Sequence, residues 1–136
     1  MTRVPELMDA GVKVAFGHDC VMDPWYSLGS ADMLEVASMG LHVAQMTGVE
    51  QMKSCFRAVT EIPAAILGLE DYGLEKGCNA DLVILQAADP VEALRLKANR
   101  LFVIRKGKII SRSAPLQAEL NLPGRPEIQD FLVHNE

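Results

Sequence analysis

The sequence predicts an α/β fold, and three observations support this prediction. A short helical segment at the N-terminus leads into residues 12–19, where bulky and small side chains alternate as they do in a strand. Residues 30–59 place apolar side chains at helical spacing. Beyond residue 71 the apolar side chains fall in short, strand-like runs. This change of periodicity predicts a boundary near residue 70, between segments 1–70 and 71–136.

Composition narrows the class of protein. The 136 residues are 49% hydrophobic and 23% charged, which is typical of one ordinary soluble domain. Thirteen basic against eighteen acidic residues give a net charge of -5, so the basic surface of a nucleic-acid-binding protein is not expected. The length excludes a complete (β/α)8 barrel, which needs about 250 residues.

Cysteine usage and hydropathy bear on location. Three cysteines without a CxxC pair argue against a disulfide framework and a structural zinc site, and a reducing cytoplasm is the simplest location. Charged residues interrupt the N-terminus, so no signal peptide is expected. The longest uncharged stretch, 36–49, is shorter than the roughly 18 apolar residues of a membrane span, and no membrane association is expected.

The N-terminal half is predicted to hold one strand and four helices. A helix over 2–10 precedes the strand, which places Val12, Val14 and Phe16 on one face and Ala15, Gly17 and Asp19 on the other. Ser30 and Asp32 start a helix that runs to about Thr47. This helix is apolar nearly all round, which predicts burial on more than one side. Two further helices are expected around 52–59 and 64–67.

The C-terminal half is predicted to be mainly β-structure. Residues 81–85 indicate a buried strand, and 101–104 with 106–110 indicate a hairpin that turns at Lys106-Gly107. Residues 90–95 suit one or two helical turns. The tail from Ser113 has no clear period and is expected to wrap the surface. Asp81 is interpreted as a structural turn residue and Glu61 as a solvated residue at a helix end.

The sharpest chemical feature is Asp19, at the end of the predicted strand. A carboxylate there suits a metal ligand or a general base, because ligands bind at strand ends in α/β folds. It equally suits a turn-forming Asp that bonds its own backbone. A three-ligand site of His18, Asp19 and Cys20 is less favoured, because consecutive strand residues point to opposite faces.

Two sequence motifs resemble a known family. Residues 17–29, GHDCVMDPWYSLG, closely resemble the segment that ends the eighth barrel strand of cytosine deaminases in the amidohydrolase superfamily. Residues 73–85 are similar to the superfamily's return from the barrel to its small β-sandwich, and 102–110 to the following hairpin. The resemblance implies the C-terminal part of a TIM-type (β/α)8 metal-dependent hydrolase barrel over 1–70, with strands of the small β-sandwich and a tail over 71–136.

The resemblance also implies a reaction and its residues. Asp19 would bind the catalytic divalent metal, zinc or iron, and handle the proton of the attacking water, whose pKa a metal lowers toward neutrality. The reaction would be hydrolytic deamination of cytosine or a related aminopyrimidine or aminopurine base, with release of ammonia. Cys20 and Trp25 would contact the base. The best-known cytosine deaminases carry Asp at the Cys20 position, and a thiol is a poorer acceptor, so the preferred base stays open. Trp25 lines the pocket or simply staples its loop.

The remaining metal ligands of the family pattern are not present in this chain. The pattern requires a His-x-His pair, further histidines and a catalytic Glu, whereas the sequence contains only His18, His42 and His134. His42 is expected to be a hydrogen-bonded helix residue and His134 to lie in the tail. Because a catalytic zinc takes about three protein ligands, the isolated chain is not expected to retain metal or to be active.

The missing metal ligands determine which partners we expect. They are a nucleobase in the complete enzyme and either the missing N-terminal barrel portion or another copy of the chain. Two other hypotheses stay open: a noncatalytic remnant or interaction subunit that binds through its barrel edge and apolar helix faces, and an amidohydrolase of cyclic amides.

Overall fold

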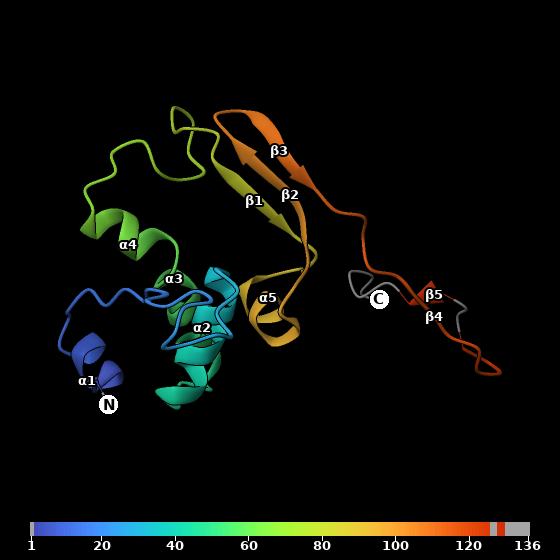
Figure 1. Cartoon of the computed structure of the whole chain (residues 1–136), viewed down its shortest axis with the longest axis horizontal. Helices are drawn as coiled ribbons and strands as arrows, with labels where there is room; N and C mark the ends of the chain where they lie inside the picture. Colours follow the sequence, from blue (N-terminus) through green and yellow to red (C-terminus); the bar gives the residue numbers. More distant parts are fainter. Residues whose placement is uncertain (1, 126–127, 130–136) are drawn as a thin grey trace.

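The computed structural model describes residues 2–125 and 128–129 (Figure 1). Five helices and five strands follow one another in the order α1 (Val4–Asp9), α2 (Met33–Val43), α3 (Val49–Arg57), α4 (Glu61–Ile66), β1 (Leu82–Leu85), α5 (Pro90–Leu96), β2 (Arg100–Arg105), β3 (Lys108–Arg112), β4 (Ala118–Glu119) and β5 (Ile128–Gln129). Helices and antiparallel strands are thus both present in the described residues, as the α/β class predicts.

The core lies among α2, α3 and α5. Its buried residues are Leu34, Ala37, Leu41, Met46, Cys55, Ala93, Leu94 and Ala98. The Cys55 side chain is fully buried, and its Sγ lies 3.8 Å from Sδ of Met46. Because α5 belongs to the predicted second segment, this core joins residues from both sides of position 70. The division into 1–70 and 71–136 stays a prediction.

Helix α2 differs from its prediction in length and burial. It ends at Val43, and the N–H of its C-cap Ala44 donates to the Gly40 carbonyl. Leu34, Ala37, Ser38 and Leu41 are buried, whereas Met39 and Val43 are exposed. Burial on more than one side is therefore found only in part: α3, α5 and the Phe16 ring pack against α2, while Met39 and Val43 stay exposed.

The prediction of a strand over residues 12–19 is wrong. Figure 1 shows this stretch as a trace that leads from α1 towards α2 and α3, and no strand is assigned to it. A strand needs a ladder of hydrogen bonds to a neighbouring strand, and the described residues place no strand beside this stretch. The predicted alternation is nevertheless present: Val14, Phe16, His18 and Cys20 are half-buried, while Lys13, Ala15, Gly17 and Asp19 are exposed. Val12, predicted on the bulky face, is itself half exposed.

The three-stranded sheet confirms the predicted hairpin. The strands lie in the order β1-β2-β3, all antiparallel, and Arg105 pairs with Lys108 across the turn. Lys106 and Gly107 both have positive φ, 47° and 74°, as a type I′ turn requires. One Asp81 oxygen accepts the Lys106 N–H at 2.5 Å and the other lies 3.3 Å from Arg105, which confirms Asp81 as a structural residue.

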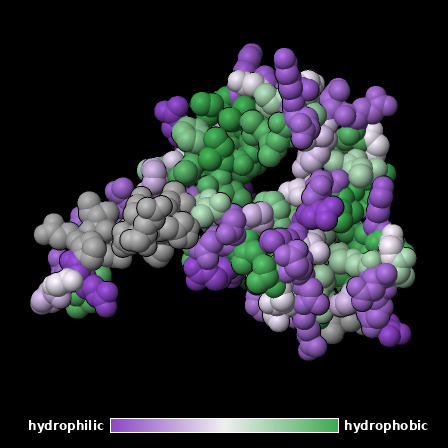
Figure 2. Space-filling view, turned by 180° about the vertical axis from the view of Figure 1, so that it is seen from behind, coloured by the Kyte–Doolittle hydropathy of each residue, from purple (hydrophilic) through white to green (hydrophobic). Residues whose placement is uncertain are grey.

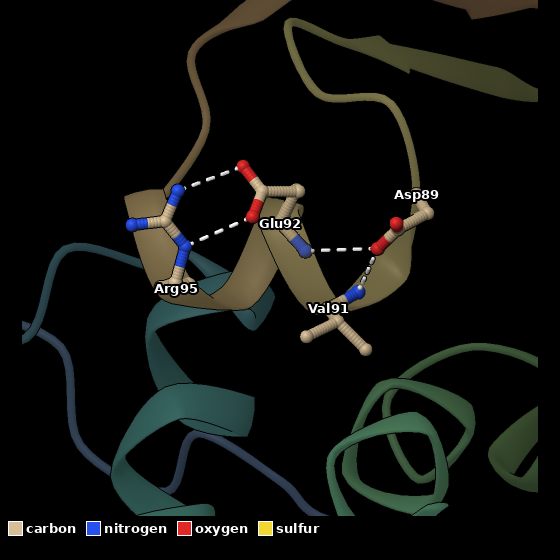
Figure 3. A network of polar contacts seen from close by, with 4 residues as sticks. All are labelled: Asp89, Val91, Glu92 and Arg95. Carbon is tan, nitrogen blue, oxygen red and sulfur yellow. Dashed lines mark hydrogen bonds and ion pairs between the residues drawn. The ribbon is translucent and has the colours of Figure 1, made fainter. Parts of the chain in front are cut away.

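Helix α5 begins where the sequence predicts, because its first turn is capped (Figure 3). Oδ1 of Asp89 accepts the N–H groups of Val91 at 2.7 Å and of Glu92 at 2.9 Å. On the next turn the Arg95 guanidinium donates to both Glu92 carboxylate oxygens at 2.9 Å. Pro90 stands at the first helical position, where its missing N–H costs nothing.

The other helices confirm their predictions approximately. Helices α1 and α3 fall within or close to the expected ranges, and α4 starts three residues early, at Glu61 rather than Ala64. Glu61 is exposed and pairs with Arg57 at 2.5 Å, so its interpretation as a solvated residue at a helix end is confirmed.

The tail stays close to the sheet only at its beginning. The Gln86 amide donates to the Leu116 carbonyl at 2.7 Å and accepts the Leu116 N–H at 2.8 Å. Beyond Leu116, β4 pairs with β5, and this pair stands apart from the helices in Figure 1. The predicted surface wrapping is thus wrong beyond Leu116 for the described residues. His134 lies outside them. No helix of the described part is both long and apolar enough to span a bilayer.

Candidate functional site

A largely apolar groove of about 750 Å³ runs between residues 14–20 and α2. Phe16 fixes the first wall: its N–H donates to the Ala58 carbonyl at 2.9 Å, and its ring lies over Gly40 of α2. A methyl group at position 40 would stand 2.5 Å from the ring. The groove therefore depends on a glycine in α2 that lets residues 14–20 approach the helix closely.

Asp19, Cys20 and Trp25 all line this groove, so the structure brings the three predicted site residues together. Their roles in binding or catalysis stay predictions. Asp19 is exposed and has a φ of +36°. Few residues other than glycine adopt positive φ, although Asp tolerates it better than most, and such backbone conformations gather at functional sites.

Asp23, which sequence reasoning treated only as part of a loop, organises the site. Its Oδ1 accepts the N–H of Trp25 at 2.9 Å and of Tyr26 at 3.0 Å. The Asp23 N–H in turn donates to the Tyr26 carbonyl at 3.3 Å. Asp23, rather than Asp19, therefore makes the local side-chain-to-backbone bonds of this loop. The Asp-Pro pair at 23–24 was the available signal for such a turn.

Cys20 is protonated at neutral pH. Its hydrogen bond with Asp23, its partial burial and the charge of Asp19 together raise the pKa of the Cys20 thiol to about 11. Because the thiolate is the reactive form of cysteine, this environment argues against a nucleophilic role for Cys20.

Gly29 closes the loop over residues 18–20. It is buried against the Cys20 carbonyl, and a methyl group there would lie 2.7 Å from Cε1 of His18. The same methyl group would lie 2.4 Å from the Cys20 carbonyl oxygen, a backbone atom, so position 29 has no room for a side chain. Trp25, by contrast, is 86% exposed at the outer part of the same loop. The loop is thus tightly packed at Gly29 and exposes an apolar side chain at Trp25.

The described residues do not by themselves form a site for a catalytic metal. In residues 2–125 and 128–129, no three or more His, Cys, Asp or Glu side chains gather closely enough to hold an ion. His18 is half-buried while its neighbour Asp19 is exposed, and Nδ1 of His42 lies 2.7 Å from the Ser38 carbonyl oxygen, the hydrogen-bonded helix position expected of it. Asp19 is therefore a single candidate oxygen ligand.

Comparison with known proteins places this site in context. Pterin deaminase of Rhizobium rhizogenes is 36% identical over 122 residues, which are 89% of this chain and 28% of that protein. N-isopropylammelide isopropyl amidohydrolase of a Pseudomonas species is 31% identical over 116 residues, 85% of this chain and 29% of that protein. The crystal structure of 5-methylcytosine deaminase from Klebsiella pneumoniae with phosphonocytosine superposes with a TM-score of 0.81 at 40% identity, over 90% of this chain and 30% of that one.

These similarities cover most of this chain but less than a third of each relative. A model of the amidohydrolase family matches residues 1–112, which include the groove, the 17–29 loop and the three-stranded sheet. The relatives are hydrolases that act on C–N bonds, and two of them are named as deaminases. The chain belongs to the amidohydrolase family.

Proposed function

We propose that this chain forms the C-terminal part of a metal-dependent amidohydrolase that hydrolytically deaminates an amino-substituted nitrogen heterocycle and releases ammonia. The observation that carries the proposal is that Asp19, Cys20 and Trp25 line one groove, in a chain that is 40% identical to a 5-methylcytosine deaminase over 90% of its length. The amidohydrolase fold of such relatives suggests a TIM-type barrel, with 1–70 supplying its last helices and 71–136 part of a small β-sandwich.

Asp19 would serve as one carboxylate ligand and as a proton acceptor. Its exposure at the groove makes both carboxylate oxygens accessible. Zinc or iron, when bound, would supply an activated water. The other ligands would come from polypeptide outside this chain, since the described residues provide no three-ligand group. On this proposal the isolated chain neither retains the metal nor catalyses the reaction.

The substrate class follows from the groove and the relatives. Pterin, 5-methylcytosine and N-isopropylammelide are flat nitrogen rings with amino or alkylamino groups, and a groove with apolar walls and an aromatic side chain suits the face of such a ring. Cytosine is one member of this class. Cys20, whose S–H is donated to Asp23, would offer the ring edge a weak sulfur acceptor rather than a carboxylate.

The cytoplasm is the proposed location of the protein. All three cysteines, Cys20, Cys55 and Cys78, are free thiols, which a reducing compartment preserves.

A spliced enzyme tests the proposed reaction. The region of Rhizobium rhizogenes pterin deaminase that this chain matches is replaced by the chain, covalently joined, and ammonia release is measured with zinc and with iron on pterin, cytosine and 5-methylcytosine. The parent enzyme is the control for the assay. We expect ammonia release from at least one of these rings.

An Asp19→Asn variant of the spliced enzyme tests the assigned residue. Asparagine tolerates the positive φ of position 19, so the fold should be retained, while loss of the charged carboxylate should lower kcat by about 100-fold or more. A folded, metal-loaded splice without ammonia release, or an Asp19→Asn variant of full activity, would contradict the proposal.

A further inference from the structure

Asp23 ties together three residues that line the groove. Its Oδ1 accepts the Trp25 N–H at 2.9 Å and the Tyr26 N–H at 3.0 Å. Its carboxylate also accepts the Cys20 S–H, and the Asp23 N–H donates back to the Tyr26 carbonyl. Cys20, Trp25 and Tyr26 all line the groove. One half-buried carboxylate therefore joins the end of the segment 14–20 to the loop that carries the aromatic side chains.

A second Asp-Pro pair in the chain makes the same bonds with a different result. Oδ1 of Asp89 accepts the N–H groups of the second and third residues after it, as Oδ1 of Asp23 does (Figure 3). Helix α5 begins at that point, and the bonds cap its first turn. Residues 21–32, by contrast, lie outside any helix or strand. The bonds of Asp23 therefore stabilise no helix, and what they fix is the position of the loop itself.

Packing does not hold the Trp25 side chain in place. It is 86% exposed, whereas a buried side chain is fixed by its neighbours. A side chain or loop that moves freely before binding loses conformational entropy when a ligand orders it, and this loss weakens binding. Bonds from Asp23 that fix the backbone at Trp25 and Tyr26 reduce the loss in advance. They should thus tighten the binding of a ring without touching it.

We propose that Asp23 is a positioning residue that sets how tightly the groove binds the substrate ring. It does not line the groove, so it acts through Cys20 and Trp25. The carboxylate fixes the Trp25 backbone and takes up the Cys20 S–H, which leaves the sulfur to face the ring as an acceptor. Such contacts are the same in the ground state and the transition state, so their loss raises KM and leaves kcat unchanged. The inference rests on the proposed function for the identity of the ring.

Asp23→Ala and Asp89→Ala form a matched pair of variants. Each removes an acceptor of two backbone N–H groups just before a proline, one beside the groove and one at α5. The chain is joined covalently to Klebsiella pneumoniae 5-methylcytosine deaminase in place of the region that it matches, and turnover of 5-methylcytosine is measured. Asp23→Ala should raise KM at least about fivefold and change kcat less than about twofold. Asp89→Ala should change neither.

Asp23→Asn tests the same role with a smaller change. Its amide keeps an acceptor for the Trp25 and Tyr26 N–H groups but lacks the charge, so its KM should lie between the values of the wild type and Asp23→Ala. Urea unfolding of the 136-residue chains checks that each variant folds. If Asp23→Ala does not fold, a KM for Asp23→Asn equal to that of the wild type overturns the proposal.

Trp25 is the only tryptophan of the chain, so its fluorescence reports on the loop. In the isolated 136-residue chain, Asp23→Ala should lower the fluorescence anisotropy of Trp25, because the backbone at positions 25 and 26 loses both bonds. Asp89→Ala should leave the anisotropy unchanged. A role of Asp23 in overall stability alone would give the two variants the same anisotropy, and that result contradicts the proposal.

Ligand binding separates a failure of this inference from a failure of the proposed function. The Kd of phosphonocytosine, the ligand in the crystal structure of the Klebsiella enzyme, is measured by calorimetry on the joined protein. If the protein does not turn over but Asp23→Ala raises this Kd at least about fivefold, the proposed function is wrong and the positioning role stands. If it turns over but Asp23→Ala changes KM and Kd no more than Asp89→Ala, or lowers kcat and leaves KM unchanged, the positioning role is wrong and the proposed function stands. A folded protein that neither turns over nor binds the ring contradicts both.

Discussion

Asp32 shows how one carboxylate can join two distant parts of the chain. Its Oδ1 accepts the Leu34 N–H at 2.7 Å and the Glu35 N–H at 3.4 Å, which caps α2. The same oxygen pairs with Arg100 at the start of β2. The start of the helix is thereby tied to the sheet. Sequence spacing predicted the cap, but an ion pair between positions 32 and 100 depends on the tertiary fold.

The ionisation of Asp32 should make stability depend on pH. Burial alone would raise the pKa of the Asp32 carboxyl, but hydrogen bonds from Arg100 and from the Leu34 N–H outweigh it and lower that pKa below its ordinary value of 3.8. A lowered folded-state pKa gives a stabilisation that is fully present above about pH 4 and is lost as the pH falls through the folded-state value.

Urea unfolding of the Asp32 variants checks this dependence. At pH 7, Asp32→Ala should lower the free energy of unfolding by about 1–2 kcal/mol, because it removes both the cap and the pair. Asp32→Asn keeps a capping oxygen and should cost less. Both differences from the wild type should shrink at pH 3. A difference that is the same at pH 7 and pH 3 would show that ionisation of Asp32 does not contribute.

Residues 12–18 contact helix α2 through the Phe16 ring, which lies over Gly40. Gly40→Ala should improve the intrinsic helix propensity of α2 by about 1 kcal/mol but force the Phe16 ring away. We expect a net loss of stability, about 1–2 kcal/mol, since the displaced ring also loosens the wall of the groove.

A double-mutant cycle measures this contact. Phe16→Leu removes the ring, so Gly40→Ala should cost much less in that background than in the wild type. Additive losses in the cycle would mean that the ring does not rest on Gly40 in solution.

Helix α5 offers a comparison between a cap and a surface ion pair. Asp89→Ala removes an acceptor for two backbone N–H groups and should cost about 1 kcal/mol. Arg95→Ala removes an exposed partner of Glu92 and should cost less than about 0.5 kcal/mol. Thermal unfolding of the two variants ranks these losses of stability. A loss for Arg95→Ala that equals or exceeds the loss for Asp89→Ala would show that the cap is not the stronger of the two interactions.

The elements that were predictable from sequence are those with local causes. Helical turns from Pro90 and the hairpin turn at Lys106-Gly107 were both predicted, because a helix start at proline and a tight turn depend on neighbouring residues. Residues 12–19 show the alternating exposure of a strand but form no ladder of backbone hydrogen bonds, because a ladder needs a second strand from a distant part of the sequence. Asp19, Cys20 and Trp25 were found through one continuous motif. The long-range contacts of Phe16 with Gly40 and Ala58 carried no comparable local signal.

At the scale of the whole molecule, helices α2, α3 and α5 share one core, while apolar residues of the sheet are exposed. Figure 2 shows hydrophobic residues gathered over the sheet on the face seen from behind. Val83, Ile109 and Ile110 of this sheet are all about half exposed or more. The described residues thus form one closed core and leave two apolar regions uncovered, the sheet and the groove.

The shared core leads to a prediction about cooperativity. Leu94 of α5 is buried with Leu34 and Leu41 of α2 and Cys55 of α3, so α5 should unfold with the two helices that precede residue 70. Leu94→Ala should destabilise all three helices together, by about 2–4 kcal/mol. Native-state hydrogen exchange resolves this by element: amides of α2, α3 and α5 should lose protection equally. Val103→Ala in β2 serves as the control and should act mainly on the sheet. If Leu94→Ala left α2 and α3 fully protected, position 70 would be a true boundary between cooperative units. Equal loss instead means that α5 folds as part of the helical unit, so that residues 1–70 alone would lack the helix that packs against α2 and α3.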